Sequence, residues 1–372
     1  MRNLRGGKIM KTLLLGDVCP TVQTDPYFKE QNIEILFGDT IKLFEKSDFT
    51  AINLECALTD SENAIKKFGP NLKACRETAQ VLGKLGVNLA GLSNNHIFDF
   101  GIEGAVDSMN ALADAGIPYT GFGKNYEDSR KNFFYEKDGE RICIVAVCEH
   151  EYSYALEDRM GSRPFDPFET MADIRQAKAQ ADRVIVMYHG GKEHCQYPSP
   201  RLIKACREMV NNGADVVLCQ HTHCIGCYES YNGAHILYGQ GNFHFVKLFE
   251  NAPYPYWDQL LAVQYDTKTN EINFVPVVNN ENGIELAKGD EKNAVMSAFE
   301  KRNASLSDGS WEKGWHEFCL SNKEQYMRVA RENPESTLVE MGDANFAHYL
   351  DCEAHTDVWR ELYKTANHRN EK

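Results

Sequence analysis

Six groups of polar residues each follow an apolar, strand-like run, and their side chains are those of a metal-centred hydrolase. Mixed carboxylate, imidazole and amide ligands suit Mn, Fe or Zn better than Ca or Mg. Such ions lower the pKa of bound water and hold the substrate, so that hydrolysis can proceed at neutral pH. In chain order, the six groups contain Asp17, Glu55, Asn94 with Asn95 and His96, His189, His221 with His223, and Asn242.

The position of these groups in the sequence predicts that they meet in space. Each follows a run that reads as a buried strand, and open α/β sheets bind their ligands at the carboxyl ends of the strands. We therefore expect one crevice that holds divalent transition metals, Mn, Zn or Fe, at two ions per chain. In two-metal sites one carboxylate usually bridges ions about 3.5–4 Å apart, and Glu55 is the candidate bridge.

Three of the expected ligands admit other interpretations. Alternate residues of an extended chain point to opposite faces, so His221 and His223 can bind together only if the chain turns after the strand. Taken alone, the pair could equally lie on the surface, but His189 at the end of the preceding strand favours ligands. The alternative for Asp17 is a helix cap or a turn carboxylate.

His96 and Asp99 are the candidate catalytic residues. A histidine oriented by a carboxylate can act as a general acid toward a leaving group. The alternative is that Asn94, Asn95 and Asp99 only build a turn, with His96 exposed. We expect Asn94 on the substrate side and Glu193 either facing the substrate or behind the metal ligands, and we expect His194 to be exposed to solvent.

The elements that must position these residues alternate between strand and helix from residue 11 to about 245. This order predicts parallel strands joined by crossover helices. Two expected hairpins indicate two sheets rather than one. The expected helices cover 76–85, 103–115, 169–181 and 199–212, and the expected hairpins cover 132–148 and 258–278.

The pattern changes near residue 283 and becomes helical, with expected helices over 289–303 and 309–331. Trp311, Trp315, Phe318 and Tyr326 are spaced to form one apolar stripe, which is typical of packing. We therefore divide the chain into an α/β domain over 11–282 and a helical C-terminal appendage over 283–372.

The composition narrows the class of partner. A formal charge of −14 over 372 residues argues against a nucleic-acid partner or an anionic membrane. No apolar run of about 18 residues is present, so we expect no transmembrane segment. The apolar residues after the basic N-terminus are too few for a signal peptide, and we expect a cytoplasmic protein.

The twelve cysteines fit a reducing compartment, in which they stay thiols. Cys224 and Cys227 have the spacing of a zinc knuckle or a redox pair. A second such pair is absent from the sequence, and the motif does not open a helix, so neither role is favoured.

These motifs resemble those of the CapA-type family of poly-gamma-glutamate capsule synthesis proteins, a branch of the calcineurin-like metallophosphoesterases. The resemblance covers roughly residues 11–246. It implies a four-layer α-β-β-α sandwich with metals at the sheet edges, His96 facing the leaving group and Asn242 at the rim of the cleft. The metal ligands that it implies are Asp17, Glu55, Asn95, His189, His221 and His223. The motifs are Gly16-Asp17, Asn53-Leu54-Glu55, Asn94-Asn95-His96 with Asp99 and Gly101, His189 with Glu193, His221-Thr222-His223 and Gly241-Asn242-Phe243.

The sequence also departs from the family pattern. Cys19 stands where generic metallophosphoesterases have a histidine, which CapA-type proteins generally lack too. Gly190 replaces the family's usual tryptophan, His194 its usual tyrosine and Thr222 its usual proline. The wall of the substrate site is therefore expected to differ from that of its relatives.

Two functions follow from the resemblance. The first is a metal-dependent hydrolase that cleaves a phosphoester or glutamyl-amide bond in capsule, poly-gamma-glutamate or envelope metabolism, with a small-molecule or polyglutamate-type substrate. The second is a non-catalytic metal-binding subunit of a capsule biosynthesis assembly, in which the appendage could contact a second copy or another subunit.

Overall fold

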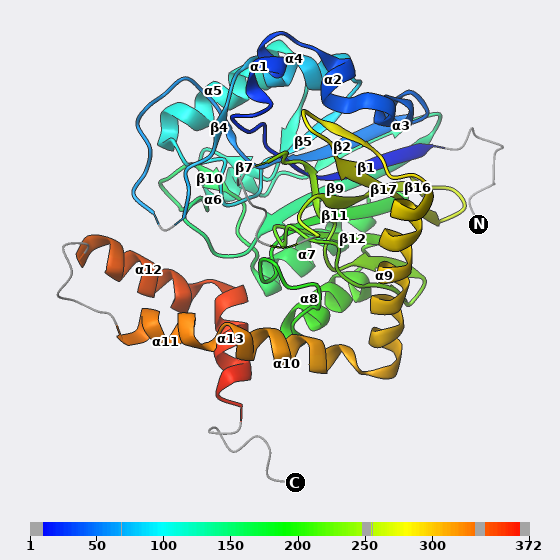
Figure 1. The fold of residues 1–372 in the computed structure, drawn as a ribbon. Coiled ribbons are helices and arrows are strands. Elements are labelled where there is room, and N and C mark those ends of the chain that lie inside the picture. Colours follow the sequence, from blue (N-terminus) through cyan, green and yellow to red (C-terminus); the bar gives the residue numbers. More distant parts are fainter. Residues whose placement is uncertain (1–9, 68, 248–253, 255, 332–338, 365–372) are drawn as a thin grey trace.

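Two β-sheets form the body of the protein in the computed structural model, which describes residues 10–364 except 68, 248–253, 255 and 332–338 (Figure 1). Within these residues, the first sheet has eight strands, in the order β18 (Ile284–Leu286), β17 (Glu271–Asn279), β16 (Gln259–Asp266), β1 (Lys11–Val18), β2 (Phe49–Leu54), β5 (Leu89–Gly91) and β6 (Tyr119–Thr120), with β15 (Asn242–His244) paired to β1. In the same part of the chain the second sheet has six, in the order β13 (Tyr228–Tyr231), β14 (Ala234–Leu237), β12 (Val216–Gln220), β11 (Arg183–His189), β9 (Glu140–Cys148) and β8 (Phe133–Lys137). Short pairs join β3 (Ala57–Leu58) to β4 (Lys73–Ala74) and β7 (Phe122–Gly123) to β10 (Gly161–Ser162).

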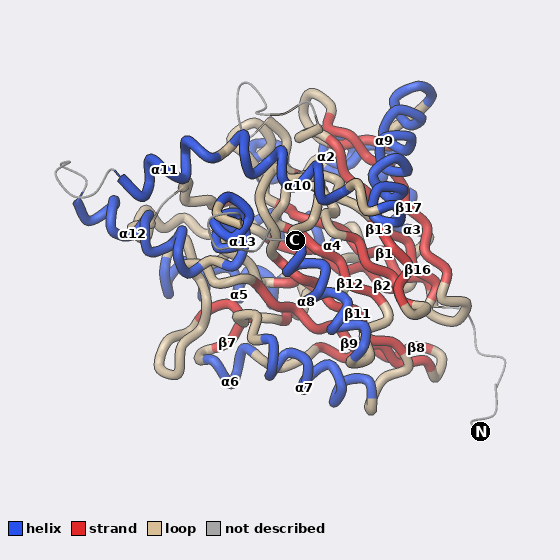
Figure 2. The backbone as a smooth tube through the Cα atoms, turned by 90° about the horizontal axis from the view of Figure 1, so that it is seen from below, coloured by secondary structure: helices blue, strands red, loops and turns tan. Residues whose placement is uncertain are grey.

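Helices cover the outer faces of the two sheets (Figures 1 and 2). The first sheet is covered by α1 (Asp25–Lys29), α2 (Ile33–Phe37), a short 3-10 helix (Gly38–Thr40), α3 (Ile41–Glu45), α4 (Glu77–Lys84) and α5 (Gly101–Asp114). The second is covered by α7 (Pro167–Lys178) and α8 (Pro200–Asn211), and the short α6 (Tyr126–Ser129) contacts β7. Helix α9 (Gly289–Asp308) contacts β13 of one sheet and β17 of the other.

The alternation of side chains along the central strands creates the layers. In β9, Val145 packs toward helices α7 and α8, whereas its neighbour Ile144 packs toward the first sheet. In β1, Leu13 packs toward the helices over the first sheet and Leu14 toward the second sheet. Because successive residues of a strand point to opposite faces, the two buried sheets share one apolar layer, and each has its own helical layer outside. The predicted four-layer α-β-β-α sandwich is confirmed.

Most expected elements lie where the sequence places them. The strands at the centre of each sheet are parallel, and the antiparallel pairs β8–β9 and β16–β17 are the two predicted hairpins. The four helices expected within the body correspond to α4, α5, α7 and α8. Within the described residues, none of the helices combines the length and the apolar character needed to cross a membrane.

The C-terminal region differs from expectation in two places. The segment after residue 283 begins with strand β18, which pairs with β17, and not with a helix. The single helix expected over 309–331 is two, α10 (Trp311–Ser321) and α11 (Lys323–Arg331), because Asn322 ends the first by donating side-chain and backbone hydrogen bonds to the Phe318 carbonyl.

Two further helices, α12 (Val339–Asp351) and α13 (Glu353–Leu362), pack with α10 and α11 into a helical unit beside the body (Figures 1 and 2). Trp315 and Tyr326 of the predicted apolar stripe are buried there with Tyr349 and Val358. The stripe therefore packs the helices together. The division of the chain into two domains stays a prediction.

Candidate metal centre

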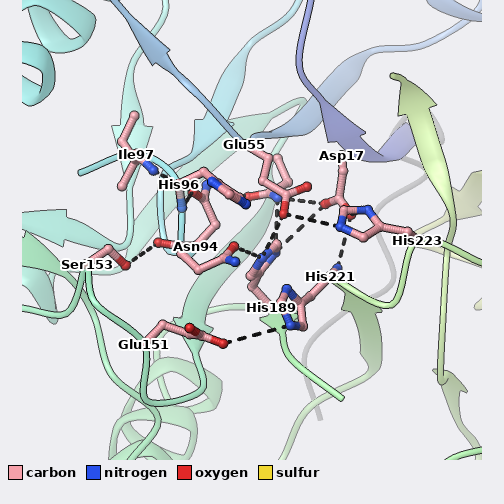
Figure 3. A network of polar contacts seen from close by, with 12 residues as sticks. Asp17, Glu55, Asn94, His96, Ile97, Glu151, Ser153, His189, His221 and His223 are labelled. Carbon is pink, nitrogen blue, oxygen red and sulfur yellow. Dashed lines mark hydrogen bonds and ion pairs between the residues drawn. The ribbon is translucent and has the colours of Figure 1, made fainter. Parts of the chain in front are cut away.

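The carboxyl ends of the parallel strands bring the predicted ligands to one place (Figure 3). Asp17, near the end of β1, lies in register with Asn242 of β15 and Asn53 of β2. His189 is the last residue of β11, and Glu55 directly follows β2. The convergence expected from the sequence is thus present, and it joins residues of both sheets.

His221 and His223 can face the same centre because the chain turns immediately after β12. Both residues have a left-handed backbone, with φ of 78° and 52°. Asp17 stabilises this turn, because its Oδ2 accepts a hydrogen bond from the backbone N–H of His221 at 3.0 Å. Non-glycine residues adopt such backbone torsions mostly where the surrounding structure enforces them, often at functional sites.

Two sets of ligands share Glu55. One contains Asp17, Glu55 and His189, the other Glu55, His221 and His223, and within each set the ligand atoms lie within 4.8 Å of one another. Oε1 of Glu55 lies 3.3 Å from Nε2 of His189 and 3.9 Å from Nε2 of His223. Asn95 joins the first set, because its Oδ1 lies 2.9 Å from Nε2 of His189.

Glu55 fits the part of a carboxylate that binds cations. It is fully buried, yet neither of its oxygens accepts a hydrogen bond within the described residues. A buried charge without a partner is strongly unfavourable, and a bound divalent ion would remove that cost. The donor set of carboxylates, imidazoles and an amide therefore fits the metals expected from the sequence.

The pKa shifts of Asp17, Glu55, His189 and His223 also fit a site for cations. Burial, with the neighbouring charge of Glu55, raises the pKa of Asp17 to about 7. Burial also raises the pKa of Glu55, and it lowers the pKa of His189 to about 4. For His223, burial lowers the pKa, but the carboxylates of Glu55 and Asp17 outweigh it, and the net shift is upward. The raised pKa values of the two carboxyl groups mean that burial disfavours their charged forms, a cost that a bound cation would offset.

Amide side chains fix the orientation of the ligands. Asn53 Nδ2 donates to Asp17 Oδ1 at 2.7 Å and lies 3.2 Å from Nδ1 of His189. Nδ1 of His223 lies 2.7 Å from Oδ1 of Asn242. An acceptor for the second ring N–H of a metal-binding histidine fixes both the tautomer and the direction of the ring, and Asn242 Oδ1 is such an acceptor for His223.

Asn94 and Asn242 do not lie where we expected them. Asn242 is 1% exposed and lies behind His223 rather than at the rim of the cleft. Asn94 is fully buried, and its Oδ1 accepts hydrogen bonds from the backbone N–H groups of His96 and Ile97. Neither amide lines the cavity, because Asn94 is bonded to the backbone of its own loop and Asn242 to His223.

His96 is held through one ring nitrogen. Its Nδ1 lies 2.7 Å from Oδ2 of Asp99 and 3.1 Å from Nζ of Lys67, which also pairs with Oδ1 of Asp99 at 2.5 Å. Burial and the charge of Lys67 lower the pKa of His96, although Asp99 acts in the opposite direction. The His96 ring borders the cavity. The turn that we considered as an alternative to a catalytic role is therefore present together with an oriented histidine.

A cavity of about 300 Å³ opens beside these residues. Lysine and histidine side chains line it together with two glutamates, and the C-terminal helices form part of its wall. Glu193 faces it as expected. His194 also lines it and packs on Trp257 at 5.4 Å between ring centroids, so the expectation that His194 is exposed is wrong. The polar lining residues include Lys67, His96, Glu151, Lys192, Glu193, His221, His223, His348 and His355.

Sequence reasoning missed Lys67, Glu151 and Asn53. Lys67 lies in an irregular segment with no motif that would identify it. Glu151 could have been found, because it belongs to a polar group that directly follows the buried strand β9. The six groups that supply the expected ligands follow their strands in the same way. Figure 3 shows its carboxylate directed at His221, and its Oε1 lies 3.9 Å from Nε2 of that residue.

The cysteines considered as ligands lie elsewhere. Cys19 packs into the apolar core between the first sheet and its helices, and burial raises the pKa of its thiol. Among the described residues, the groups with metal-binding geometry include neither Cys19 nor the pair Cys224 and Cys227. All twelve cysteines are buried free thiols.

Comparison with known proteins places the chain among capsule synthesis proteins. The family model described as "Bacterial capsule synthesis protein PGA_cap" matches residues 11–247. The "Capsule biosynthesis protein CapA" of Bacillus anthracis is 27% identical over 298 residues, covering 77% of this chain and 70% of that protein. The "PGA biosynthesis protein CapA" of Bacillus subtilis is 28% identical over 243 residues, covering 64% of this chain and 63% of that protein. A solved structure of a putative 5'-nucleotidase from Staphylococcus aureus, in complex with alpha-ketoglutarate, aligns with a TM-score of 0.43 at 12% identity, covering 79% of this chain and 58% of that one.

Proposed function

This chain belongs to the family of bacterial capsule synthesis proteins named PGA_cap, and we propose that it is a metal-dependent hydrolase of a phosphoester bond. We further propose that it acts in capsule or polyglutamate metabolism, the process named in the titles of its relatives. A cytoplasmic location stays a prediction.

The observation that carries the proposal is Glu55, which belongs to two ligand sets at once and has buried oxygens without hydrogen bonds within the described residues. Divalent ions would be held by Asp17, Glu55, Asn95, His189, His221 and His223. Bound there, they would supply polarisation of a phosphoryl oxygen and a lower pKa for attacking water.

The residues around the ligands fit an anionic substrate. Lys67 and Lys192 border the cavity and are mostly buried. Each also pairs with a carboxylate, Lys67 with Asp99 at 2.5 Å and Lys192 with Glu193 at 3.7 Å. A phosphoester and a glutamyl amide with free carboxylates are both anionic, and the lysines suit either of them; the choice of a phosphoester rests on the metal ligands.

His96 is proposed to assist departure of the leaving group. Nδ1–H of the ring donates to Asp99 Oδ2 at 2.7 Å, which leaves Nε2 to exchange a proton. Lys67 also fixes Asp99 by pairing with its other oxygen. In this arrangement the His96 ring keeps a constant orientation toward a substrate bound in the cavity.

The test combines metal content with turnover. Protein purified without chelator or nickel is analysed by elemental mass spectrometry, and it is then assayed with p-nitrophenyl phosphate, bis-p-nitrophenyl phosphate and gamma-glutamyl p-nitroanilide. We expect at least about two transition ions per chain and turnover of a phosphoester. The His221→Ala variant should lose both, whereas His316→Ala, at an exposed histidine of α10, should lose neither.

Other outcomes have defined meanings. Unchanged turnover in His221→Ala would contradict the proposal. Cleavage of the glutamyl amide alone would keep the hydrolase but change its substrate class. Metal binding without turnover of any of the three compounds would favour the second function, a non-catalytic metal-binding subunit of a capsule biosynthesis assembly.

A further inference from the structure

Helices α12 and α13 bring a histidine, a cysteine and a second histidine together at the wall of the cavity. The three residues are His348, Cys352 and His355, and their ligand atoms lie within 4.8 Å of one another. His348 and Cys352 are one helical turn apart, and the N–H of Cys352 donates to the His348 carbonyl at 3.0 Å. His355 lies in the first turn of α13. All three side chains line the same cavity as His96 and His221.

We propose that His348, Cys352 and His355 form a further metal site, selective for zinc. Two imidazoles with one thiolate are a donor set that zinc binds in both structural and catalytic sites. Soft thiolate disfavours magnesium, calcium and manganese. The site is distinct from the centre at Glu55, with which it shares none of these three residues, and it does not depend on the function proposed above.

Neighbouring side chains already orient the two imidazoles. Nδ1 of His355 lies 2.7 Å from the hydroxyl of Tyr326, and the ring stacks on Tyr349 with centroids 4.0 Å apart. The ring of His348 stacks on Tyr152 at 5.1 Å. A hydrogen bond at one ring nitrogen is the usual means of directing the other nitrogen at a metal, so Nε2 of His355 is the expected ligand atom.

Glu151 supplies the fourth position. Its Oε1 lies 3.6 Å from Sγ of Cys352, and its Oε2 lies 3.5 Å from Nδ1 of His348. Zinc is almost always tetrahedral in structural sites, so this carboxylate completes the coordination. The same Oε1 lies 3.9 Å from His221 Nε2, and Glu151 therefore connects the new site to the centre at Glu55.

Zinc binding would require a small contraction. Zn–N and Zn–S bonds of about 2.0–2.3 Å give tetrahedral edges of about 3.5 Å, so ligand atoms up to 4.8 Å apart would close in by up to about 1.3 Å. Without zinc, the same groups could simply form a hydrogen-bonded contact between Cys352 and Glu151. The presence of a sulfur atom bound to zinc distinguishes these two states.

The experiment is zinc K-edge X-ray absorption on the full chain loaded with zinc, together with zinc content by elemental mass spectrometry. We expect a sulfur shell at about 2.3 Å in the unaltered protein. Cys352→Ser should lose this shell and about one zinc ion per chain. The matched control is Cys319→Ser, which alters another buried cysteine of the helical unit and should keep both.

The outcomes separate this proposal from the function proposed above. The absence of a zinc–sulfur shell in the unaltered protein would overturn the site, and that measurement does not depend on any variant folding. A shell that persists in Cys352→Ser would also overturn it. In His189→Ala, the sulfur shell should remain while zinc bound at Glu55 decreases, so that failure of the centre at Glu55 and failure of this site are observed independently.

Discussion

A Cβ atom at Gly190 would lie 2.5 Å from Cγ of the buried Glu149. Glu149 thus fills the space that a side chain at residue 190 would need. Its Oε1 accepts hydrogen bonds from the Tyr188 hydroxyl at 2.8 Å and from Arg201 at 2.5 Å. Arg201 also donates to Asp357 of α13 at 2.7 Å. The missing side chain at residue 190 therefore makes room for a charged network that docks the C-terminal helices on the body.

Gly190→Ala is expected to destabilise the protein by about 1–3 kcal/mol, the usual cost of overpacking a filled site. The free energy of unfolding from urea titration measures it. In a Glu149→Ala background the same change should cost less, because the clashing carboxylate is gone and the two positions are coupled. Equal costs in both backgrounds would show that Glu149 is not the obstacle.

Asp357→Ala is expected to loosen α12 and α13 without unfolding the sheets. Its buried carboxylate accepts hydrogen bonds from Arg201 and, at 2.6 Å, from the Ser199 hydroxyl, and bonds to charged groups contribute about 1.5–3 kcal/mol each. Hydrogen exchange should rise over 345–362 and stay unchanged in β9 and β11. Glu324→Ala, at an exposed acid of α11, is the control. Protection that is unchanged in the Asp357 variant would exclude this docking contact.

Metal affinity is expected to fall as the pH decreases below about 7. Asp17 has a pKa raised to about 7, so below that value it holds a proton that a metal ion must displace. The raised pKa of His223 acts in the same direction. Each displaced proton weakens binding about tenfold per pH unit. Calorimetric titration with manganese at pH 6 and pH 8 measures the difference, and Asp17→Asn should reduce it.

The same group predicts a pH dependence of stability in chelator-treated protein. Because the folded-state pKa of Asp17 is higher than its unfolded value of 3.8, its contribution favours the folded state at low pH and is lost as the pH rises through about 7. Bound metal should abolish this loss. Denaturation midpoints at pH 5 and pH 8, with and without manganese, test it, and a loss of the same size in the loaded protein would contradict it.

Asn242→Ala is expected to lower metal affinity by about 10–100-fold, the usual effect of removing a partner that orients a ligand. His223 would lose the hydrogen bond at Nδ1 that fixes its ring. Competition with a chromophoric chelator measures the affinity. Asn273→Ala, which removes an exposed amide of β17, should leave it unchanged. Equal affinities of the Asn242 variant and the unaltered protein would refute the orienting role.

His96→Ala is expected to lower kcat by about 10²–10⁴ for a phosphoester with a poor leaving group. The loss should be much smaller for p-nitrophenyl phosphate, whose leaving group departs without a proton. Metal content should stay unchanged, because His96 is outside both ligand sets at Glu55. Steady-state kinetics with an alkyl and an aryl ester decide the matter, and an equal loss for both would argue against proton transfer by His96.

Much of the body could be predicted because its signals are local. A run such as Val184 to Tyr188 can be buried only as a strand, and the polar residue that follows it must lie at the end of that strand. Parallel pairing of β1 and β2 then brings Asp17 and Glu55 to one edge of the first sheet. The packing of the two sheets places His189, at the end of β11 in the second sheet, beside them. The turn required by the spacing of His221 and His223 was also expected, and both residues adopt the left-handed backbone that produces it.

The roles of the loop residues could not be predicted in this way. Whether Asn94 and Asn242 point into the cavity or behind it depends on backbone torsions after the strand, and a strand pattern does not specify these. The structure buries both. Lys67 and Asp99 are 32 positions apart, and their pairing is a single contact that has no periodic signature in the sequence.

The sequence by itself determined the strands of the body, the order in which helices and hairpins connect them, and the polar residues that follow the strands. Each of these depends on the apolar pattern of a few neighbouring residues. Only the tertiary structure decided which groups share Glu55 and which helices close the cavity. Contacts such as that of Cys352 with Glu151 join residues 201 positions apart. They depend on how helices α12 and α13 pack against the body, and that packing is set by surfaces formed only after both parts have folded.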